Sequence, residues 1–211
     1  SGGPLGLPRT SFTYDARGNV LTVTNPDGSV RTYEYDTLAS GGQSKFGVPT
    51  RIVDEEGRDT RFAFDSGTGA VAMITRVVGG ALGGNDDIIT AFTYTDGSVG
   101  TYEDLPIGLL LTITEDIGSF AGNAKVTTAY DYFTNPSNLY EFGRLAAVTR
   151  DAANEQEEEW IVESFEYDTH GFLKAYEDGL GQRIEINYDV LGRVLEIIQP
   201  YPNPADFDEV D

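Results

Sequence analysis

The residue best suited to acid–base catalysis in this chain is its single histidine, His170. A histidine titrates near neutral pH, so it is the usual general base of a hydrolase and the usual partner of a serine nucleophile. His170 lies between Asp168 and Gly171, in a tetrapeptide whose residue types are typical of a tight turn. Because the chain has no cysteine, any nucleophilic triad would depend on this one turn histidine. The position therefore favours an exposed turn residue over a catalytic one.

Carboxylates are the other groups with chemical potential, since the chain contains 35 Asp and Glu residues. A pair of carboxylates at a suitable spatial separation is the machinery of a glycoside hydrolase, which is the least favoured alternative here. The segment 83–87, Gly-Gly-Asn-Asp-Asp, offers oxygen ligands of the kind that calcium prefers, but it lacks the spacing of an EF-hand or a calcium-binding β-roll. We predict no catalytic, cofactor-binding or metal-binding residues, with calcium at 83–87 as the alternative to a flexible acidic loop.

An acidic segment surrounds the single tryptophan. Residues 151–168 contain eight acidic side chains and no Lys or Arg, with Trp160 among them. Such a surface suits a basic partner or a sugar, whereas an isolated large apolar side chain more often packs into the core. The 12 tyrosines pose the same choice between a sugar-stacking strip and packing against neighbouring strands. Packing is favoured in both cases, and a carbohydrate-binding module is the alternative.

The charge and composition of the chain exclude several classes of partner. With 14 basic against 35 acidic residues, the net charge of −21 repels nucleic acid phosphates and anionic lipid headgroups. The apolar runs 70–82 and 107–113 are too short or too interrupted to span a bilayer. The first residues resemble the remnant of an expression vector and not a secretory signal, so we expect a piece of a longer protein.

A recurring Tyr-Asp-x-x-Gly motif gives the chain its organisation. It occurs at residues 14–18, 167–171 and 188–192. The segment from Tyr14 to Tyr35 shows how one repeat is built. Residues 20–24 and 30–35 are rich in β-branched and aromatic residues, and they flank the turn sequence Asn-Pro-Asp-Gly at 25–28. This pattern predicts a strand, a turn and a second strand. We expect the aromatic residue of successive repeats at Tyr14, Tyr35, Phe64, Tyr94, Tyr130, Tyr167 and Tyr188.

Turn chemistry explains the Asp and the Gly of the motif. An Asp that accepts bonds from the amides ahead of it begins a turn, and a Gly takes the left-handed conformation that closes it. The same Asp-x-x-Gly pattern occurs at 54–57 and 178–181, and 151–154 substitutes Asn for Gly. Alternation along residues 183–188 places Ile184, Ile186 and Tyr188 on one face of a strand, and no segment predicts an amphipathic helix.

These motifs resemble the YD-repeat, or RHS-repeat (rearrangement hotspot), family. The match is clearest at 14–21 and 188–195, and Phe142-Gly143-Arg144-Leu145 preserves the second half of the pattern. The resemblance implies a long spiralling β-sheet that curls into a hollow shell. In bacterial toxin complexes such a shell encloses a toxic segment, and in teneurins it serves adhesion. The chain departs from some toxin-bearing relatives because it has no Asp-Pro-containing self-cleavage region.

The expected fold class is all-β, with about seven antiparallel strand-turn-strand units in one curved sheet. Residues 10–200 form the repeat region, 1–9 are a vector remnant or lead-in, and 201–211 are a Pro-rich acidic tail. The longer spacings place insertion loops at 41–47, 79–87 and 134–143, where specific recognition is expected.

The expected function is structural and not enzymatic. The chain is predicted to be a wall segment of an exported or cell-surface protein that encloses a toxin or other cargo or presents an adhesive surface. Its partners are neighbouring repeats or the cargo, without nucleic acid or membrane insertion. An edge-to-edge homodimer is the further expectation, because an open sheet leaves unpaired edge strands.

Overall fold

A computed structural model describes residues 7–35, 47–80, 82–84, 86–97, 105–116, 125–151 and 160–200. These residues form strands, turns and irregular connections, and none of them is helical. Within this described part, no helix is long and apolar enough to cross a membrane. The all-β prediction is therefore confirmed.

Fourteen strands form one sheet in which every strand pairs with its neighbours in sequence. All of the pairings are antiparallel, so the fold is a continuous meander. The strands are β1 (Ser11–Tyr14), β2 (Val20–Thr24), β3 (Val30–Glu34), β4 (Arg51–Val53), β5 (Asp59–Phe64), β6 (Val71–Val77), β7 (Ile88–Tyr94), β8 (Leu110–Asp116), β9 (Lys125–Tyr132), β10 (Leu145–Arg150), β11 (Ile161–Tyr167), β12 (Leu173–Glu177), β13 (Arg183–Tyr188) and β14 (Val194–Ile198).

Each repeat unit is a hairpin made of an odd-numbered strand and the even-numbered strand that follows it, which gives the predicted seven units. In six of the seven units the register shifts at the end of the odd strand, where the aromatic residue of the repeat lies. In the first unit, for example, Thr13 pairs with Thr22 but Tyr14 pairs with Val20. Such a bulge bends the strand and increases its twist, so the bulges in these six units add curvature along the sheet.

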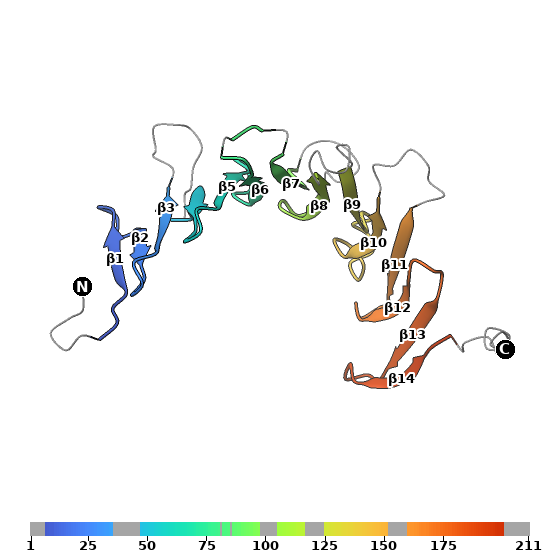
Figure 1. Cartoon of the computed structure of the whole chain (residues 1–211). Coiled ribbons are helices and arrows are strands. Elements are labelled where there is room, and N and C mark those ends of the chain that lie inside the picture. Colours follow the sequence, from blue (N-terminus) through green and yellow to red (C-terminus); the bar gives the residue numbers. More distant parts are fainter. Residues whose placement is uncertain are drawn as a thin grey trace, which may run out of the picture.

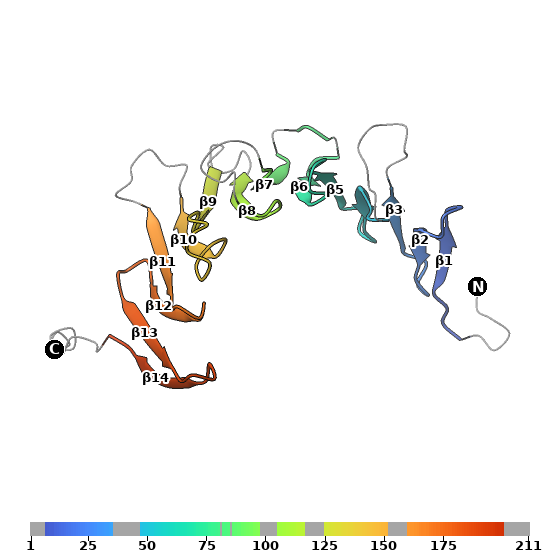
Figure 2. The same cartoon turned by 180° about the vertical axis from the view of Figure 1, so that it is seen from behind.

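The sheet bends into an arch, with β1 and β14 at opposite ends (Figure 1). The view from behind shows the same arch, and no second sheet or helix covers either side of the described strands (Figure 2). The sheet is therefore one layer thick.

A single layer explains why the protein has almost no core. Among the described residues, only Leu105, Val148 and Ala175 are buried hydrophobic residues, and no large side chain is fully buried. The described strands lie side by side in one sheet and do not fold back over one another as those of a globular domain do.

The two faces of the sheet differ in composition. Cross-strand pairs place all of the strand phenylalanines and tyrosines on one side, which we call the aromatic face. The opposite side, which we call the threonine face, carries Thr, Ala and most of the charged strand residues, and hydroxyl pairs on it join neighbouring strands. These pairs are Thr13–Thr22 at 2.6 Å, Thr93–Thr112 at 2.7 Å and Thr114–Thr127 at 3.1 Å.

The predicted alternation in β13 agrees with the pairing, because Ile184 and Ile186 point to the aromatic face and Arg183 and Glu185 to the threonine face. Both isoleucines are only half-buried. The reason is the missing second layer: alternation sorts side chains between the faces, but only a covering layer buries them.

Candidate functional site

The Asp of the repeated motif builds each turn through its own carboxylate. In the last unit, Asp189 Oδ1 accepts hydrogen bonds from the amides of Leu191 and Arg193, both at 2.9 Å. The amide of Gly192 donates to the carbonyl of Asp189 at 2.9 Å, and Gly192 has a φ of 77°. Equivalent bonds occur at Asp15, Asp54, Asp168 and Asp178. The Asp and Gly of the motif thus have the turn-building role predicted from the sequence.

These hydrogen bonds stabilise the ionised form of the carboxylates and so lower their pKa. Amide hydrogen bonds, first from Arg193, hold the pKa of Asp189 below its ordinary value of 3.8. In the first unit, the side-chain amide of Asn19 is the main cause that lowers the pKa of Asp15. Carboxylates of low pKa stay ionised near neutral pH and are poor general acids. The motif therefore stabilises turns and does not resemble an acid–base centre.

In four units, the repeat tyrosine joins its unit to the preceding one. Its hydroxyl donates to the carbonyl of the first residue of the preceding even-numbered strand, and partial burial raises the pKa of Tyr94, Tyr132 and Tyr167. We call this contact the tyrosine clamp. The four clamps are Tyr94 to Val71 at 2.7 Å, Tyr132 to Leu110 at 2.8 Å, Tyr167 to Leu145 at 3.1 Å and Tyr188 to Leu173 at 2.9 Å.

The clamps correct one repeat position. The sequence motif placed the fifth aromatic position at Tyr130, which precedes an aspartate, but the clamp is made by Tyr132. Tyr132 also pairs with Leu145 at the register shift, as five other repeat aromatics pair with the first residue of the next strand. The Tyr-Asp dipeptide misled the assignment because that aspartate lies within β9 and does not begin a turn.

Ring contacts strengthen the aromatic face near the C-terminal units. Phe172 lies 5.1 Å from Tyr188 and Phe165 lies 5.3 Å from Tyr176, measured between ring centroids. The guanidinium of Arg144 lies 5.1 Å from the ring centre of Tyr167. These contacts and the clamps support the prediction that the repeat tyrosines pack against neighbouring units.

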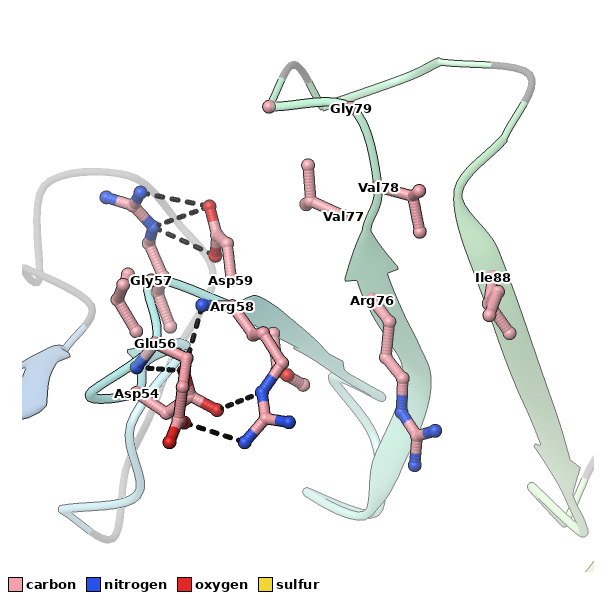
Figure 3. A pocket seen from close by; sticks show the side chains of 14 residues that line it. Asp54, Glu56, Gly57, Arg58, Asp59, Arg76, Val77, Val78, Gly79 and Ile88 are labelled. Atoms are coloured by element: carbon pink, nitrogen blue, oxygen red, sulfur yellow. Dashed lines mark hydrogen bonds and ion pairs between the residues drawn. The ribbon is translucent and has the colours of Figure 1, made fainter.

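A cavity of about 760 Å³ lies beside the β4–β5 hairpin and the ends of β6 and β7 (Figure 3). Its charged lining forms two ion-pair groups. Arg51 binds Asp59 at 2.9 Å on the threonine face, and Arg58 binds Asp54 at 2.6 Å in the turn. Arg76, on β6, lies apart from both groups in Figure 3 and forms no ion pair with a described residue.

The electrostatics of this cavity are those of paired charges. Burial alone would raise the pKa of Asp59, but hydrogen bonds from Arg51 and Arg61 outweigh it and keep that pKa below its ordinary value. Burial is also the largest single influence on Asp54, but the hydrogen bonds and charge of Arg58, together with the amide of Glu56, outweigh it and lower the pKa of Asp54. Asp54 and Asp59 are therefore held in their ionised form and are poor proton donors at neutral pH. The cavity was not predicted from the sequence. The alternation of Arg and Asp along residues 51–61 could have indicated the ion pairs that line it.

His170 lies in the turn between β11 and β12, as its sequence position predicted. Its side chain is 69% exposed, and its Nδ1 lies 3.7 Å from a carboxylate oxygen of Asp168, the residue that begins the same turn. Its ring stacks loosely with Phe172, 6.4 Å away. Among the described residues no serine contacts this pair, so the structure brings the histidine together with turn residues only.

The calcium candidate at 83–87 is described except for residue 85. Asp87 is 5% exposed, and its two carboxylate oxygens accept the amides of Val78 at 2.9 Å and Gly83 at 2.8 Å. This aspartate holds the β6–β7 loop closed through backbone amides. Within the described residues, no three acidic or histidine side chains are grouped to hold a metal ion. Calcium binding by the whole segment stays the untested alternative to a flexible acidic loop.

The other predicted regions are described in part. Three of the predicted regions lie wholly or mostly outside the described residues. They are the first insertion loop (36–46), most of the acidic segment (152–159) and the tail (201–211). Trp160 is half-buried immediately before β11. The third insertion is a compact turn in which the amide of Phe142 donates to the carbonyl of Asn138 at 2.9 Å.

Part of the chain matches a known protein family. The family profile described as RHS Repeat matches residues 9–38. The chain contains an RHS repeat. The matched residues include the turn 15–18 and strands β1, β2 and β3, so the RHS repeat corresponds to the first hairpin unit and the start of the second. This match confirms the resemblance to the YD/RHS-repeat family that the motif predicted.

Solved structures similar to the RHS-repeat chain include toxin complexes. The pore of the Photorhabdus luminescens Tc holotoxin, with a substitution in TccC3, is 15% identical, covers 92% of this chain and 12% of that chain, and has a TM-score of 0.41. TcdB2-TccC3 without its hypervariable C-terminal region is 18% identical over 94% of this chain and 10% of that chain, with a TM-score of 0.45. The RHS-repeat chain thus spans about a tenth of the length of these solved chains. No curated protein matches it in sequence.

Proposed function

We propose that the chain is a wall segment of a β-sheet shell in an exported protein, and that the complete shell encloses a toxin or another cargo. The observation that carries the proposal is a curved sheet of fourteen strands with no second layer over either face. An RHS repeat occupies its first units. The role is structural: the wall acts by steric enclosure, and neither the turns nor the cavity supplies a catalytic step.

A wall built in this way follows from the chemistry of the repeat. Neighbouring units pair through backbone hydrogen bonds, and at four of the six junctions between units a tyrosine clamp fixes the register against the previous unit. The bulge in six of the seven units turns the sheet progressively. Continuing the same units would extend the arch. Residues 10–200 are the proposed repeat region, with 1–9 as a lead-in and 201–211 as a tail.

The large negative charge supports a wall exposed to water on a wide surface. A one-layer sheet cannot hide its apolar residues in a core, so solubility must come from charge. The net charge of −21 supplies it and also repels copies of the wall from one another at long range. Export is the proposed location, because RHS-type shells are expected outside the cell.

The test is to express the longest open reading frame that contains these residues and to image the product by electron microscopy. The proposal expects a hollow particle and an internal segment that resists protease until the particle is opened by denaturant. A solid particle, or a segment that is cleaved at the same rate before and after opening, would contradict it. Binding of a glycan with loss of that binding on Trp160→Ala would support the carbohydrate-binding alternative instead.

A further inference from the structure

The four tyrosine clamps are confined to one part of the sheet. They join the third unit (β5 and β6) to the fourth and continue unit by unit to the seventh. Neither junction of the second unit (β3 and β4) has a clamp. The hydroxyl of Tyr35 makes no hydrogen bond with a described residue, and the repeat aromatic of the third unit is Phe64, which has no hydroxyl. The second unit therefore connects the first unit to the clamped units three to seven without a clamp of its own.

The second unit also has the least backbone pairing of the seven. Its strand β4 is three residues long, which makes it the shortest described strand of the sheet. Three residue pairs join β3 to β4, whereas four to six pairs join the two strands of every other unit. It is also the unit without a register shift. The second unit thus lacks both the bulge and the longer ladder that hold the shape of the other units.

A proline explains why β4 is short. Each clamp is accepted two positions before the residue that pairs with the third residue ahead of the repeat tyrosine, as Leu173 lies before Ala175. The other three clamps have the same register. In the second unit the corresponding paired residue is Arg51, so Pro49 stands where a clamp would be accepted. Because proline has no amide to donate to a neighbouring strand, the pairing of β4 begins after Pro49.

Ion pairs join the second unit to its neighbours where clamps are absent. Arg51 binds Glu34 on β3 and, at 2.9 Å, Asp59 on β5, so one guanidinium connects three strands. Arg31, on β3, binds Glu55 at 2.8 Å in the turn between β4 and β5. The side chains of Arg31 and Glu34 are 43% and 59% exposed. Dissolved salt weakens ion pairs between exposed charges, whereas it has little effect on a hydrogen bond between neutral groups. The cohesion of the second unit therefore depends on ionic strength more than that of the clamped units.

We propose that the second unit is the hinge of the arch. In this hinge, β4 separates from β3 and β5 more easily than any other strand separates from its neighbours, and the first unit changes its angle to units three to seven. Salt favours the motion because it weakens the pairs of Arg51 and Arg31. A wall with one soft unit can adjust its curvature locally while the clamped units keep their register. Hinge motion is a property of the sheet and does not depend on what the wall encloses.

Amide hydrogen exchange of the full chain tests the hinge. At low salt, the amides of β4 should exchange at least about tenfold faster than those of β8, after correction for intrinsic rates. Raising sodium chloride from about 20 mM to about 500 mM should speed exchange in β4 by a further twofold to fivefold or so, and leave β8 and β9 unchanged. Equal protection of β4 and β8, or a salt effect of the same size throughout the sheet, would overturn the proposal.

Two arginine variants separate the hinge from a general effect of lost ion pairs. Arg51→Gln should speed exchange in β4 by about twofold to fivefold at low salt and should abolish most of the further effect of salt. Arg183→Gln is the matched control, because Arg183 also binds two carboxylates, those of Glu166 and Glu185, but lies in a clamped unit. Exchange in β13 of this control should change by less than about twofold. An equal acceleration at both sites would contradict the hinge.

A gain of function tests the missing clamp. Phe64→Tyr supplies the absent hydroxyl, with the carbonyl of Pro49 as its acceptor in the register of the other clamps. Exchange in β4 and β5 should become about threefold to tenfold slower, the effect of one net hydrogen bond. The control is Phe62→Tyr, two residues earlier on the same face of β5, which should not slow exchange. Unchanged or faster exchange in Phe64→Tyr would show that the missing clamp is not the cause of the soft unit.

Spin labels measure the motion directly, because the chain has no cysteine of its own. Labels at Ala16→Cys and Ser66→Cys lie in turns on either side of the second unit, and labels at Ser137→Cys and Val190→Cys lie in the equivalent turns on either side of the clamped sixth unit. The first pair should give the broader distance distribution by pulsed electron paramagnetic resonance, and salt should broaden it further. Equal widths for the two pairs would exclude a hinge at the second unit.

Discussion

Single residues in this protein act mainly on backbone groups. A repeat aspartate binds amides two and four positions ahead, and a repeat tyrosine binds a carbonyl on the neighbouring strand. Polar side chains that satisfy backbone groups fix a conformation instead of creating a reactive site. The same residue types beside one another, a phenol and a carboxylate, would otherwise suggest chemistry.

Removing one clamp tests the assignment of Tyr132. Tyr132→Phe should lower the free energy of unfolding by about 0.5–1.5 kcal/mol, because it deletes the hydrogen bond to the carbonyl of Leu110. Tyr130→Phe is the matched control, since its hydroxyl makes no hydrogen bond with a described residue and lies on the same strand. Urea unfolding followed by tyrosine fluorescence compares the two. An equal effect of both variants would return the repeat position to Tyr130.

Alanine substitutions at two turn glycines can distinguish the cost of backbone strain from the cost of side-chain crowding. Gly181 and Gly192 have φ values of 75° and 77°, so alanine at either position should cost about 1 kcal/mol of stability. At Gly181 a Cβ would meet nothing within 4 Å, whereas at Gly192 it would lie 2.6 Å from Phe172. Gly192→Ala should therefore be the more destabilising in thermal melts. The reverse order would show that the aromatic ring moves freely aside.

At the scale of elements, each hairpin depends on its two neighbours alone. In the described part of the sheet, the backbone of each strand pairs only with the strands next to it in sequence, and no layer packs across the sheet. Stability is then close to a sum of unit and junction terms, as in other repeat proteins. The ion pairs on the threonine face join adjacent or next-adjacent strands, as Arg183 does with Glu166 at 2.7 Å. Since such exposed pairs are worth about 0–1 kcal/mol each, backbone pairing carries most of the cohesion.

Truncation tests this independence of units. A chain that ends at Glu177 lacks β13 and β14 and loses the clamp from Tyr188 to Leu173. Amide hydrogen exchange should become faster in β11 and β12, while the protection of β5 to β8 stays within about a factor of three of the full chain. A chain without residues 1–24 should show the mirror result at β3 and β4. Loss of protection throughout the sheet would mean that the units fold as one cooperative domain.

The whole molecule is held as an open arch with many ionised turns. Six aspartates that begin or support turns have a lowered pKa, which means that folding favours their charged form. The unfolded state then binds more protons on acidification. Their contribution to stability is complete above the ordinary pKa of 3.8 and is lost as the pH falls through the lower values of the folded state.

Acid unfolding should therefore begin below about pH 4, where the unfolded carboxylates gain protons. Melting temperatures from circular dichroism between pH 7 and pH 2.5 measure this. The combined substitution Asp15→Asn and Asp189→Asn removes two titrating groups and keeps an acceptor that can build the turn, so its acid decline should be shallower. A melting temperature that rises steadily below pH 4 would contradict the role of these turns.

The sequence alone determined the turns, the hairpin units and the fold class, because those features depend on hydrogen bonds between residues a few positions apart. Asp189 and Gly192, for example, build their turn through hydrogen bonds within one short segment, so an Asp and a Gly at this spacing predict the turn from the sequence alone. It also placed His170 in an exposed turn. Tertiary structure decided that Tyr132 and not Tyr130 is the clamp, that Arg51, Asp59 and Arg76 line one cavity, and that neither face is covered. These features depend on how strands that are far apart in sequence pair with one another. That register is set by hydrogen bonds between strands and cannot be read from any one local segment.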